Sequence, residues 1–583
     1  MQKIISSKIT VKTVILILAM SSLLSIAPQT AEASFVPSTS TFRLGLFFGS
    51  TALPSANLQN VDGMGRGYEF GYYDSNRNFV SVGAWTDETR ITMTMDRNMV
   101  WHPGEDGGWG EYREGTSGSV VIGAFHVQLN AGYGTFEEAR AIAANYTGGF
   151  VRYENGTFLV LVGHHTSRAA AESAMAALGV SGAAINSGTS NTITVTRTGS
   201  STIIFEFEHG TSRHLGVIPR PVGNENPETW FRGYTYNGGF QYARREGALL
   251  SVTHFVSVED YIKGILPYEM NNTWPLEALK AQAMCARTYA MSYVNRHGSS
   301  GFDLCVEVHC QVYRGRNRAN ERTDRAVEET AGMYITYDGA LTRTYYASSN
   351  GGASENSENV WFDTLPYLRG VIDPYEADVA NRIPNYNWTR TFTPAEITQR
   401  LQNRGHNVST IVSMRVSEYT PTGNVLSVTL TDTNGRRVVL SRREGTNGLN
   451  TVLGTPTQRF YIGDSRPGGG GVFINESGHS VGSGDSLSII DGNGNIISVP
   501  GGSLHAITGS GSVELVTGSA GGSSGGSNDT GLVNGVFTIR GTGSGHNVGM
   551  SQWGAYSMAE YHGKTFEEII LFYFTGVEIT RTA

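Results

Sequence analysis

Short hydrophobic segments separated by turn residues run through the N-terminal part of the chain. Residues 41–115 contain FRLGLFF, GYEFGYYD and ITMTMD, whose apolar positions alternate or cluster between Gly, Asn and Asp. Such alternation indicates half-buried strands, and the intervening residues favour turns. We therefore expect 41–115 to be a β-rich region, and its pattern assigns it no chemical role.

The pattern changes in residues 118–190. VIGAFHVQLNAG reads as a strand, and TFEEARAIAANY as a helix capped by Thr135. FVRYENGTFLVLVG indicates a hairpin that turns at Asn155-Gly156, and SRAAAESAMAALG a second helix ending at Gly179. The order β-α-β-β-α, with a further strand after it, predicts a small α+β unit of ferredoxin-like type.

Strand patterns return at 191–262, and helix and strand patterns mix from 263 to 380. RPGGGG and GSAGGSSGGSNDTG then flank LSIIDGNGNIISVPGG, which indicates a hairpin near Gly492-Asn493-Gly494. We expect residues 466–535 to be a Gly/Ser-rich insertion carrying a small β appendage. The whole pattern predicts an α+β multidomain protein.

The N-terminus and the charge bear on location and partners. Lys3, Lys8 and Lys12 precede a short apolar run at 14–26, and Ala31 and Ala33 supply small residues for cleavage. We expect residues 1–33 to be an export signal, the alternative being an uncleaved membrane anchor, so the protein is extracellular or associated with the cell wall. The formal net charge is −8 and no long basic run occurs, so we do not expect nucleic acid as a partner.

The chain has only three cysteines, which argues against a disulfide framework. Cys305, His309 and Cys310 supply three ligands that suit zinc, and His297 is the nearest candidate for a fourth. We expect a structural zinc site here. The alternative is a local Cys–Cys pair or free thiols. Cys285 lies among alanines in a helix pattern and reads as a small core residue.

Glu269 is a carboxylate with apolar and aromatic neighbours. It lies in ILPYEM, just before a helix pattern that begins at Pro275 and is expected to end at Gly298. Desolvation disfavours the charged form and raises the pKa, so such a carboxyl can act as a general acid near neutral pH. Taken alone, a glutamate in this position also fits a cap or a surface residue.

Four ordered motifs resemble the SpoIID/LytB family, the stage II sporulation protein D type. They are DYIKGILPYEMNNTWPLEALKAQAMCARTYA, CVEVHCQVYRG at 305–315, TYYASSNGGASENSENVW at 344–361, and GSGHNVGMSQWGAYSMA at 543–559. The resemblance implies a β-rich α+β catalytic domain in two parts, 195–465 and 536–583. It also implies a lytic transglycosylase that cuts glycan strands without stem peptides, with Glu269 as the catalytic residue and 305–315 as a zinc segment.

The resemblance also suggests the residues that contact substrate. These candidates lie on the helix after Glu269, in the Ser- and Gly-rich loop, and in the C-terminal motif: Gln282, Arg287, Tyr346, Ser348, Ser349, Asn350, Gly351, His546, Ser551 and Gln552. One departure from the family pattern is Asn547, which replaces a glycine. Because Asn tolerates left-handed backbone better than most residues, we expect the change to be mild.

Residues 118–190 resemble a SPOR domain, a module that binds glycan strands stripped of stem peptides. The resemblance covers FHVQLNAGYGTFEEARAIA, the YENGTFLVLVG hairpin and the second helix. It implies a glycan-binding role for this unit. The alternative is a small α+β spacer.

Together these resemblances imply a peptidoglycan lytic transglycosylase that forms 1,6-anhydro-MurNAc ends with Glu269 as a single acid and base. Glu277 and Asp260 are the candidates for a second carboxylate, although Glu277 lies where it would interact with a helix dipole. Two rivals remain. One is a non-catalytic peptidoglycan binder that enhances a wall amidase, and the other is a hydrolase with a catalytic zinc.

Overall fold

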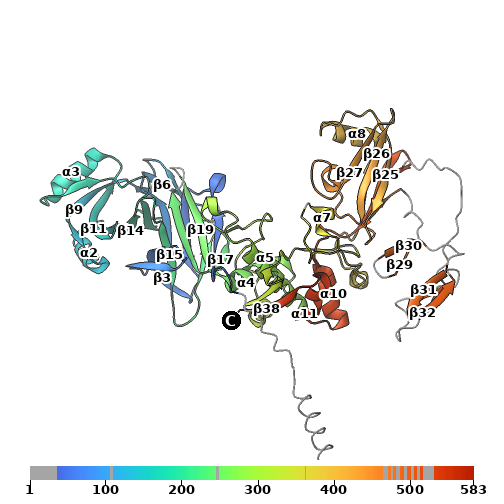
Figure 1. Ribbon diagram of the computed structural model, residues 1–583. Helices are drawn as coiled ribbons and strands as arrows, with labels where there is room; N and C mark the ends of the chain where they lie inside the picture. Colours follow the sequence, from blue (N-terminus) through green and yellow to red (C-terminus); the bar gives the residue numbers. More distant parts are fainter. Residues whose placement is uncertain are drawn as a thin grey trace, which may run out of the picture.

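The structure is a computed structural model that describes residues 36–104, 109–244, 249–361, 363–463 and 531–582, together with the backbone of short strands between 471 and 515. The expected export signal, residues 1–33, lies outside the described residues. Figure 1 shows β-sheets on one side, a helical centre, and a separate lobe carrying α8 and β25–β27. The α+β multidomain class is confirmed. The described helices include none that is long and apolar enough to span a bilayer.

A seven-stranded sheet joins the start of the chain to residues far along it. Its order is β20-β1-β19-β18-β15-β3-β4. The strands are β1 (Thr41–Phe47), β3 (Gly65–Tyr73), β4 (Phe79–Thr86), β15 (Leu215–Pro221), β18 (Gly239–Arg244), β19 (Leu250–Ser257) and β20 (Leu304–Cys305). Because Thr41 pairs with Ser257, the predicted region 41–115 is not a separate unit but folds together with the strands before residue 258.

A ten-stranded sheet has the order β12-β9-β11-β10-β14-β13-β5-β2-β16-β17. Its strands are β2 (Ser55–Asn60), β5 (Arg90–Met95), β9 (Phe125–Tyr133), β10 (Gly149–Glu154), β11 (Thr157–His165), β12 (Ala184–Asn186), β13 (Ile193–Arg197), β14 (Ile203–Glu208), β16 (Glu228–Phe231) and β17 (Tyr234–Asn237). A three-stranded sheet lies beside it, formed by β6 (Met99–His102), β7 (Glu111–Glu114) and β8 (Val121–Ile122).

The predicted ferredoxin-like unit forms one end of the ten-stranded sheet. Helices α2 (Phe136–Ala143) and α3 (Arg168–Leu178) alternate with strands that pair antiparallel in the order β12-β9-β11-β10. Thr135 caps α2, Gly179 ends α3 with φ 65°, and Asn155-Gly156 makes the turn, all as predicted. The unit is not independent of its neighbours, because its strand β10 pairs in parallel with β14, which lies outside the unit.

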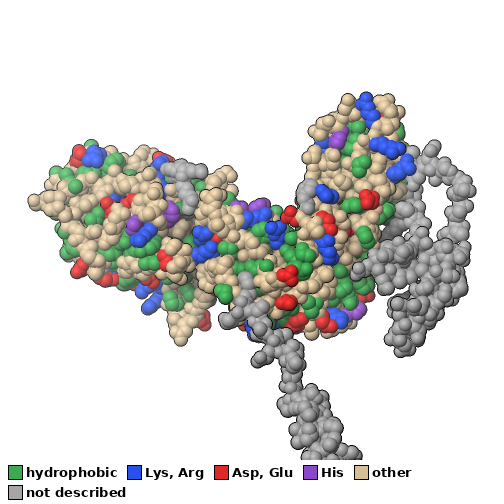
Figure 2. Space-filling model, viewed as in Figure 1, with side chains coloured by type: hydrophobic (Ala, Val, Ile, Leu, Met, Phe, Trp, Pro, Cys, Tyr) green, Lys and Arg blue, Asp and Glu red, His purple; other side chains and the backbone are tan. Residues whose placement is uncertain are grey.

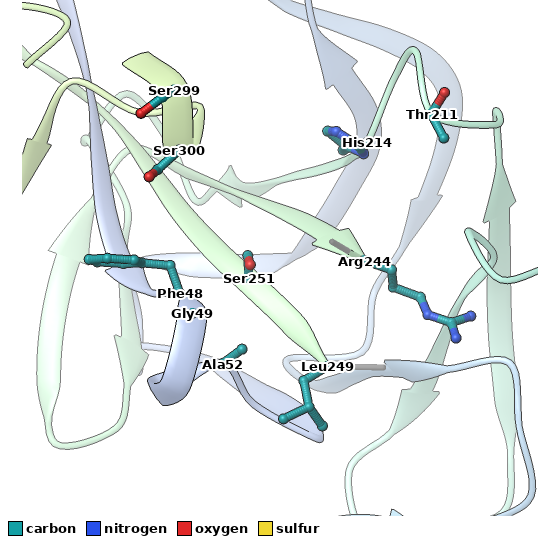
Figure 3. Close-up of a pocket in the computed structure, with 10 residues that line it drawn as sticks. All are labelled: Phe48, Gly49, Ala52, Thr211, His214, Arg244, Leu249, Ser251, Ser299 and Ser300. Carbon is teal, nitrogen blue, oxygen red and sulfur yellow. The ribbon is translucent and has the colours of Figure 1, made fainter. Parts of the chain in front are cut away.

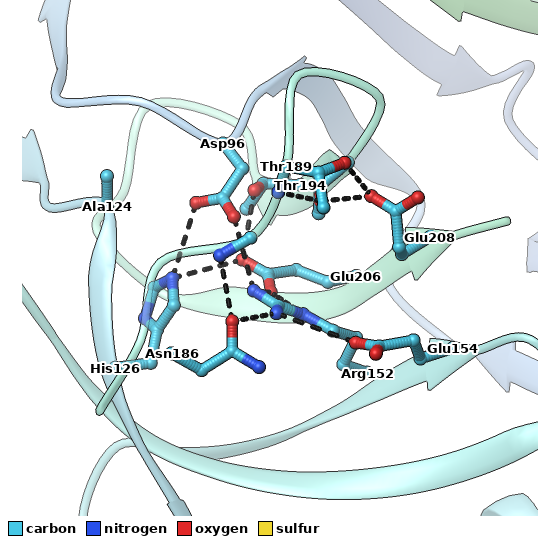
Figure 4. Close-up of polar contacts among 12 residues, drawn as sticks. Asp96, Ala124, His126, Arg152, Glu154, Asn186, Thr189, Thr194, Glu206 and Glu208 are labelled. Carbon is cyan, nitrogen blue, oxygen red and sulfur yellow. Dashed lines mark hydrogen bonds and ion pairs between the residues drawn. The ribbon is translucent and has the colours of Figure 1, made fainter. Parts of the chain in front are cut away.

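A buried charged cluster lies where this unit joins the rest of the sheet (Figure 4). Arg152 contacts Glu206 at 2.6 Å and Asp96 at 3.2 Å, and His126 lies 3.4 Å from both carboxylates. All four side chains are at most 1 % exposed. Because β9, β10, β14 and the residue directly after β5 each contribute one of these groups, the cluster holds the predicted unit 118–190 against the N-terminal strands.

The centre is built from helices α4 (Val258–Glu269), α5 (Leu276–Ser292), α6 (Glu321–Glu329), α10 (Gln552–His562) and α11 (Phe566–Tyr573). Pro275 is the N-cap of α5, as predicted, but α5 ends before the predicted Gly298 because Tyr293 leaves the helical conformation and Asn295 is left-handed. Small strands complete the centre: β21 (Met333–Tyr337), β22 (Ala340–Leu341), β23 (Tyr346–Ala347), β37 (Met550–Ser551) and β38 (Glu578–Arg581).

The separate lobe has its own hydrophobic core. It contains β24 (Asn387–Phe392), α8 (Pro394–Gln402), β25 (Ile411–Tyr419), β26 (Val425–Asp432), β27 (Arg437–Ser441), α9 (Leu449–Leu453), β28 (Phe460–Ile462), β35 (Leu532–Val533) and β36 (Val536–Thr542). Ile462 pairs with Ile539, so the chain on either side of residues 464–530 meets in one sheet.

Within the expected insertion only short strands are described. They are β29 (Gly471–Ile474), β30 (Ser477–Ser480), β31 (Ser486–Ile490), β32 (Ile496–Pro500), β33 (His505–Ile507) and β34 (Val513–Leu515). The pairing of Ile490 with Ile496 confirms the predicted hairpin strands, whose turn residues lie outside the described part.

Candidate active site

Glu269 is the last residue of α4. The helix begins at Ser257, whose hydroxyl accepts a hydrogen bond from the Asp260 N–H, and it ends because Met270 adopts extended backbone. Ile265, Leu266 and Pro267, just before Glu269, are buried. The helix therefore places the carboxyl at the edge of the hydrophobic core, as its apolar neighbours in the sequence predicted.

The carboxyl of Glu269 is largely enclosed. The main-chain N–H of Val312 and the hydroxyl of Tyr346 hydrogen-bond to it, and both lower its pKa. Burial outweighs them and raises the pKa of Glu269 from 4.5 to about 7. Near neutral pH a substantial fraction of the carboxyl is therefore protonated, which is what a general acid requires.

Tyr346 is held by residues that the sequence did not reveal. Gln311 donates a hydrogen bond of 3.1 Å from its amide to the Tyr346 hydroxyl oxygen, and its carbonyl accepts one of 3.0 Å from Tyr261. Since the Tyr346 oxygen accepts from Gln311, its own proton is available to Glu269. Gln311 directly follows Cys310, and that position in the sequence is the only sign of its role.

The four predicted metal ligands converge. One ligand atom from each of His297, Cys305, His309 and Cys310 lies within 4.8 Å of every other. Cys310 Sγ is 3.4 Å from His297 Nε2 and 3.7 Å from His309 Nδ1, and none of the cysteines is in a disulfide. A Cys₂His₂ set with this convergence fits a tetrahedral zinc ion.

This ligand set is linked directly to Glu269. Gln311 and Val312 follow Cys310, and they contact Tyr346 and Glu269 respectively. The loop that would be closed by a metal therefore also carries the hydrogen-bond donors of the carboxyl. Cys285, by contrast, is fully buried in α5, as expected for a core residue.

Much of the Ser- and Gly-rich loop is engaged inside the protein. Glu376 is buried and accepts hydrogen bonds from the Ser349 hydroxyl, the Asn350 and Gly351 N–H groups, and the Ser551 hydroxyl. We predicted that these four residues contact substrate. Their polar groups instead fix the loop onto Glu376, a carboxylate that the sequence analysis missed. In the printed sequence, nothing around YEADV marks it as buried.

The Asn350 side chain is engaged in the same way. It donates a hydrogen bond of 2.8 Å to Asp373, which also accepts one of 2.6 Å from Tyr573. Ser348 differs from its neighbours, because its side chain is exposed. Within this loop, Tyr346 and Ser348 are thus the predicted residues with side-chain groups best placed for a ligand.

Arg287 does not line a cleft, contrary to our prediction. It is fully buried and pairs with Glu259 at 2.6 Å, and it also donates to main-chain carbonyls of Val327 and Met333. Its guanidinium joins α4, α6 and β21. The helix turns about 140° between positions 282 and 287, so the two residues point to different sides.

Gln282 and Gln552 do lie beside Glu269. The Gln552 amide donates 3.0 Å to the Glu269 carbonyl and 3.4 Å to the Gln282 carbonyl oxygen. His546 packs on Trp361, with ring centroids 5.1 Å apart, and burial lowers its pKa to about 4, so it is neutral at physiological pH. Asn547 has φ 66°, as expected for a residue in place of glycine, and its amide donates 2.7 Å to the Asn350 carbonyl.

The two candidate partner carboxylates have other roles. Glu277 accepts from Lys280 and from the Phe566 N–H at the start of α11, and Asp260 accepts from Ser257 at the start of α4. Both carboxylates are thus engaged in contacts at the start of a helix. A cavity of about 690 Å³ is lined by Phe48, Arg244 and Ser300 among others, and none of the predicted site residues is in its lining (Figure 3).

Comparison with known proteins identifies the class. Residues 246–337 match the SpoIID family model, described as stage II sporulation protein, and this span contains Glu269 and all four metal-ligand candidates. This part of the chain is thus similar to the SpoIID family, as its motifs suggested, and stage II sporulation protein D of two Bacillus species is among the relatives.

Three relatives show the extent of this similarity. An uncharacterized protein of Brachyspira hyodysenteriae is 27% identical over 368 residues, which cover 63% of this chain and 78% of the relative. The amidase enhancer of Bacillus subtilis is 29% identical over 321 residues, 55% of this chain and 40% of the relative. Stage II sporulation protein D of Bacillus subtilis is 25% identical over 342 residues, 56% of this chain and 75% of the relative.

Proposed function

We propose that this protein is a peptidoglycan lytic transglycosylase that cleaves MurNAc–GlcNAc β-1,4 linkages in glycan strands without stem peptides. The supporting observation is the pKa of Glu269, about 7, in a carboxyl hydrogen-bonded by Tyr346 and Val312. A carboxyl that is readily protonated and deprotonated near neutral pH can serve as acid and base in turn.

The reaction needs one carboxyl. Protonated Glu269 donates its proton to the bridging oxygen while the bond from that oxygen to MurNAc C1 breaks. The C6 hydroxyl of the same MurNAc then attacks C1, and ionised Glu269 accepts the hydroxyl proton. One product carries a free C4 hydroxyl and the other a 1,6-anhydro-MurNAc end. No water is consumed, so no second carboxylate is required to activate it.

The surrounding residues hold the carboxyl for both steps. Tyr346 donates its hydroxyl proton toward Glu269, because its oxygen already accepts from Gln311. Once Glu269 is ionised, this donor stabilises the negative charge until the proton returns. Gln552 fixes the backbone of Glu269 through its carbonyl.

The second candidate function is a non-catalytic enhancer of a wall amidase. Two observations favour it: one relative is named amidase enhancer, and Ser349, Asn350 and Ser551 are bound internally instead of facing a ligand. Such a protein would bind glycan strands and the amidase but release no anhydro-sugar.

The deciding experiment is mass spectrometry of the products from peptide-free glycan strands incubated with the protein and with Glu269→Gln. An enzyme releases 1,6-anhydro-MurNAc ends, and the variant does not. An enhancer releases none with either protein, and both stimulate a purified wall amidase equally.

We further propose a structural zinc ion held by His297, Cys305, His309 and Cys310. The support is the convergence of two thiols and two imidazoles, which fill all four positions of a tetrahedral ion. When bound, zinc would close the loop that positions Gln311 and Val312. Four protein ligands leave no open position for a reacting water, which argues against a catalytic metal.

Location and glycan capture complete the proposal. The apolar N-terminal segment, residues 14–26, supports export to the extracellular side or the cell wall, cleaved or anchored. The ferredoxin-like unit is proposed to act as a SPOR-type module that binds peptide-free glycan. By tethering the strand it would raise the substrate concentration at Glu269.

A further inference from the structure

Three arginines without carboxylate partners lie along one edge of the site. In this protein of net charge −8, most buried or half-buried arginines pair with acidic residues. Within the part of the chain that the structure describes, Arg232, Arg318 and Arg322 form no ion pair. We call these three residues the arginine strip, and all three are exposed.

Two members of the strip contact residues on either side of Glu269, one at the end of α4 and one in the loop that follows it. The Arg318 guanidinium carbon is 5.0 Å from the centre of the Tyr268 ring, and Tyr268 directly precedes Glu269. Arg322 donates 3.4 Å to the carbonyl of Trp274, at the end of the same loop. The loop itself is fixed, because Asn272 donates 2.8 Å to the Arg318 carbonyl.

The third member extends the strip away from Glu269. Arg232 lies at the turn between β16 and β17 with φ 47°, and its guanidinium carbon is 5.2 Å from the centre of the Phe47 ring. Asn317, next to Arg318, binds this turn through the Gly233 carbonyl at 2.9 Å. Short hydrogen-bonded connections therefore join Arg232 to Arg318.

Aromatic faces and cavities accompany the arginines. Arg232 borders a cavity of about 480 Å³ lined by Tyr234 and Tyr236, and a second of about 310 Å³ where Trp109 stacks on Trp230 at 4.1 Å. Figure 2 shows basic side chains grouped over the middle of the viewed face, where Figure 1 labels β17, α4 and α5. Cations beside aromatic faces fit a ligand that is both a sugar and an anion.

We propose that the arginine strip binds the carboxylates of the glycan strand. This rests on the proposed function, because removal of a stem peptide leaves a free carboxylate on each muramic acid, whereas an intact stem peptide converts it to a neutral amide. The strip then distinguishes peptide-free strands by the carboxylate attached directly to each muramic acid. Guanidinium groups bind carboxylates in a planar, two-point geometry, and exposed pairs of this kind weaken with salt.

The test compares two glycans that differ only in that carboxylate. Peptide-free strands, and the same strands with their carboxylates converted to methylamides, are titrated into the full chain carrying Glu269→Gln, so that no cleavage occurs. The methylamide strands are expected to bind about tenfold more weakly, and the difference should shrink at high salt.

A matched set of variants locates the effect. On the Glu269→Gln background, the triple variant R232Q/R318Q/R322Q should lose about tenfold in affinity for carboxylate strands and little for methylamide strands. The control is R325Q. Arg325 is an exposed arginine on α6, the helix of Arg322, and it pairs with Glu329 at 2.5 Å, so its replacement should leave both affinities unchanged. Unfolding temperatures of all variants should agree.

Several outcomes would overturn the strip. One is equal affinity of the Glu269→Gln chain for the carboxylate and methylamide strands. Another is an unchanged affinity for carboxylate strands in the triple variant. A third is binding of mixed-sequence single-stranded DNA as tightly as the carboxylate strands. Failure of the proposed function is a separate result: carboxylate-dependent binding without any anhydro-sugar from the wild-type chain. Equal cleavage of both strands would retain the enzyme and reject the strip.

Discussion

The side chain of Gln552 donates a hydrogen bond of 3.0 Å to the main-chain carbonyl of Glu269, across 283 positions of sequence. This contact fixes the end of α4 against the start of α10. Gln552 follows β37, which pairs with the strand that carries Tyr346, so the same junction also positions the hydroxyl beside the carboxyl. The geometry of the proposed acid thus depends on three distant segments at once.

Replacing Glu269 by Gln should abolish cleavage without unfolding the protein. The amide keeps the size of the side chain but cannot exchange a proton, so the rate of anhydro-sugar release should fall by about 10²–10⁴. Product mass spectrometry at pH 5 measures this. Glu277→Gln is the control, because Glu277 only binds Lys280 and the start of α11. Activity within about threefold of wild type in Glu269→Gln would reject the assignment.

The pH dependence should follow the pKa of Glu269. Because the acid must be protonated, kcat/KM should decline as pH rises through about 7. Initial rates on peptide-free strands between pH 5 and 9 test this. A rate that stays level to pH 9 would contradict the role of Glu269 as acid.

The same shift predicts a change in stability. The pKa of Glu269 is raised from 4.5 to about 7 on folding, so the folded chain holds a proton that the unfolded chain has released in this window. The stability that this provides is present below pH 4.5 and lost as pH rises through 7. Glu269→Gln should therefore unfold about 2–4 °C above wild type at pH 8, but not at pH 4. Thermal scans at both pH values decide, and an equal difference at both would exclude this origin.

Cys310→Ser, or removal of metal with a chelator, should lower stability and activity together. A structural zinc contributes to folding, and the residues after Cys310 hold Tyr346 and Glu269. We expect the unfolding temperature to fall by more than about 5 °C, with loss of product release. Metal analysis should find one zinc per wild-type chain. Cys285→Ser, at a position outside the ligand set, should keep the metal. Loss of activity at unchanged stability would instead indicate a catalytic metal.

Arg152→Met should destabilise the N-terminal sheets. It leaves Asp96 and Glu206 buried without their guanidinium partner, and such a loss costs about 3–5 kcal/mol of unfolding free energy. Urea unfolding followed by tryptophan fluorescence measures it. Arg97→Met removes an exposed pair with Glu114 and should cost less than about 1 kcal/mol. Similar midpoints for the two variants would mean that the cluster is not important for stability.

Local features of the fold could be predicted from the sequence, and distant pairings could not. Thr135, Gly179 and the Asn155-Gly156 turn act within a few residues of themselves, so their roles were readable. The pairing of Thr41 with Ser257 depends on contacts between remote strands, which no local pattern records. For that reason the boundary expected after residue 115 is absent.

In the candidate site, too, local features could be predicted from the sequence and distant contacts could not. The apolar neighbours of Glu269 are adjacent in sequence, and they predicted its raised pKa. Gln311 and Glu376 carry no local sign of burial, and only the fold shows what they bind. Arg287 was misplaced because a helical motif does not tell which side of the helix faces the ligand.

The contact between Glu269 and Gln552 also determines when, during synthesis of the chain, the site can form. A ribosome makes α4 long before α10, so a chain that stops at residue 540 has the carboxyl but neither Gln552 nor β37. Tyr346 would then lack the strand that holds it. An enzyme of the proposed kind would therefore be inactive until its last residues have been made and folded, and a prematurely terminated copy would not cleave glycan.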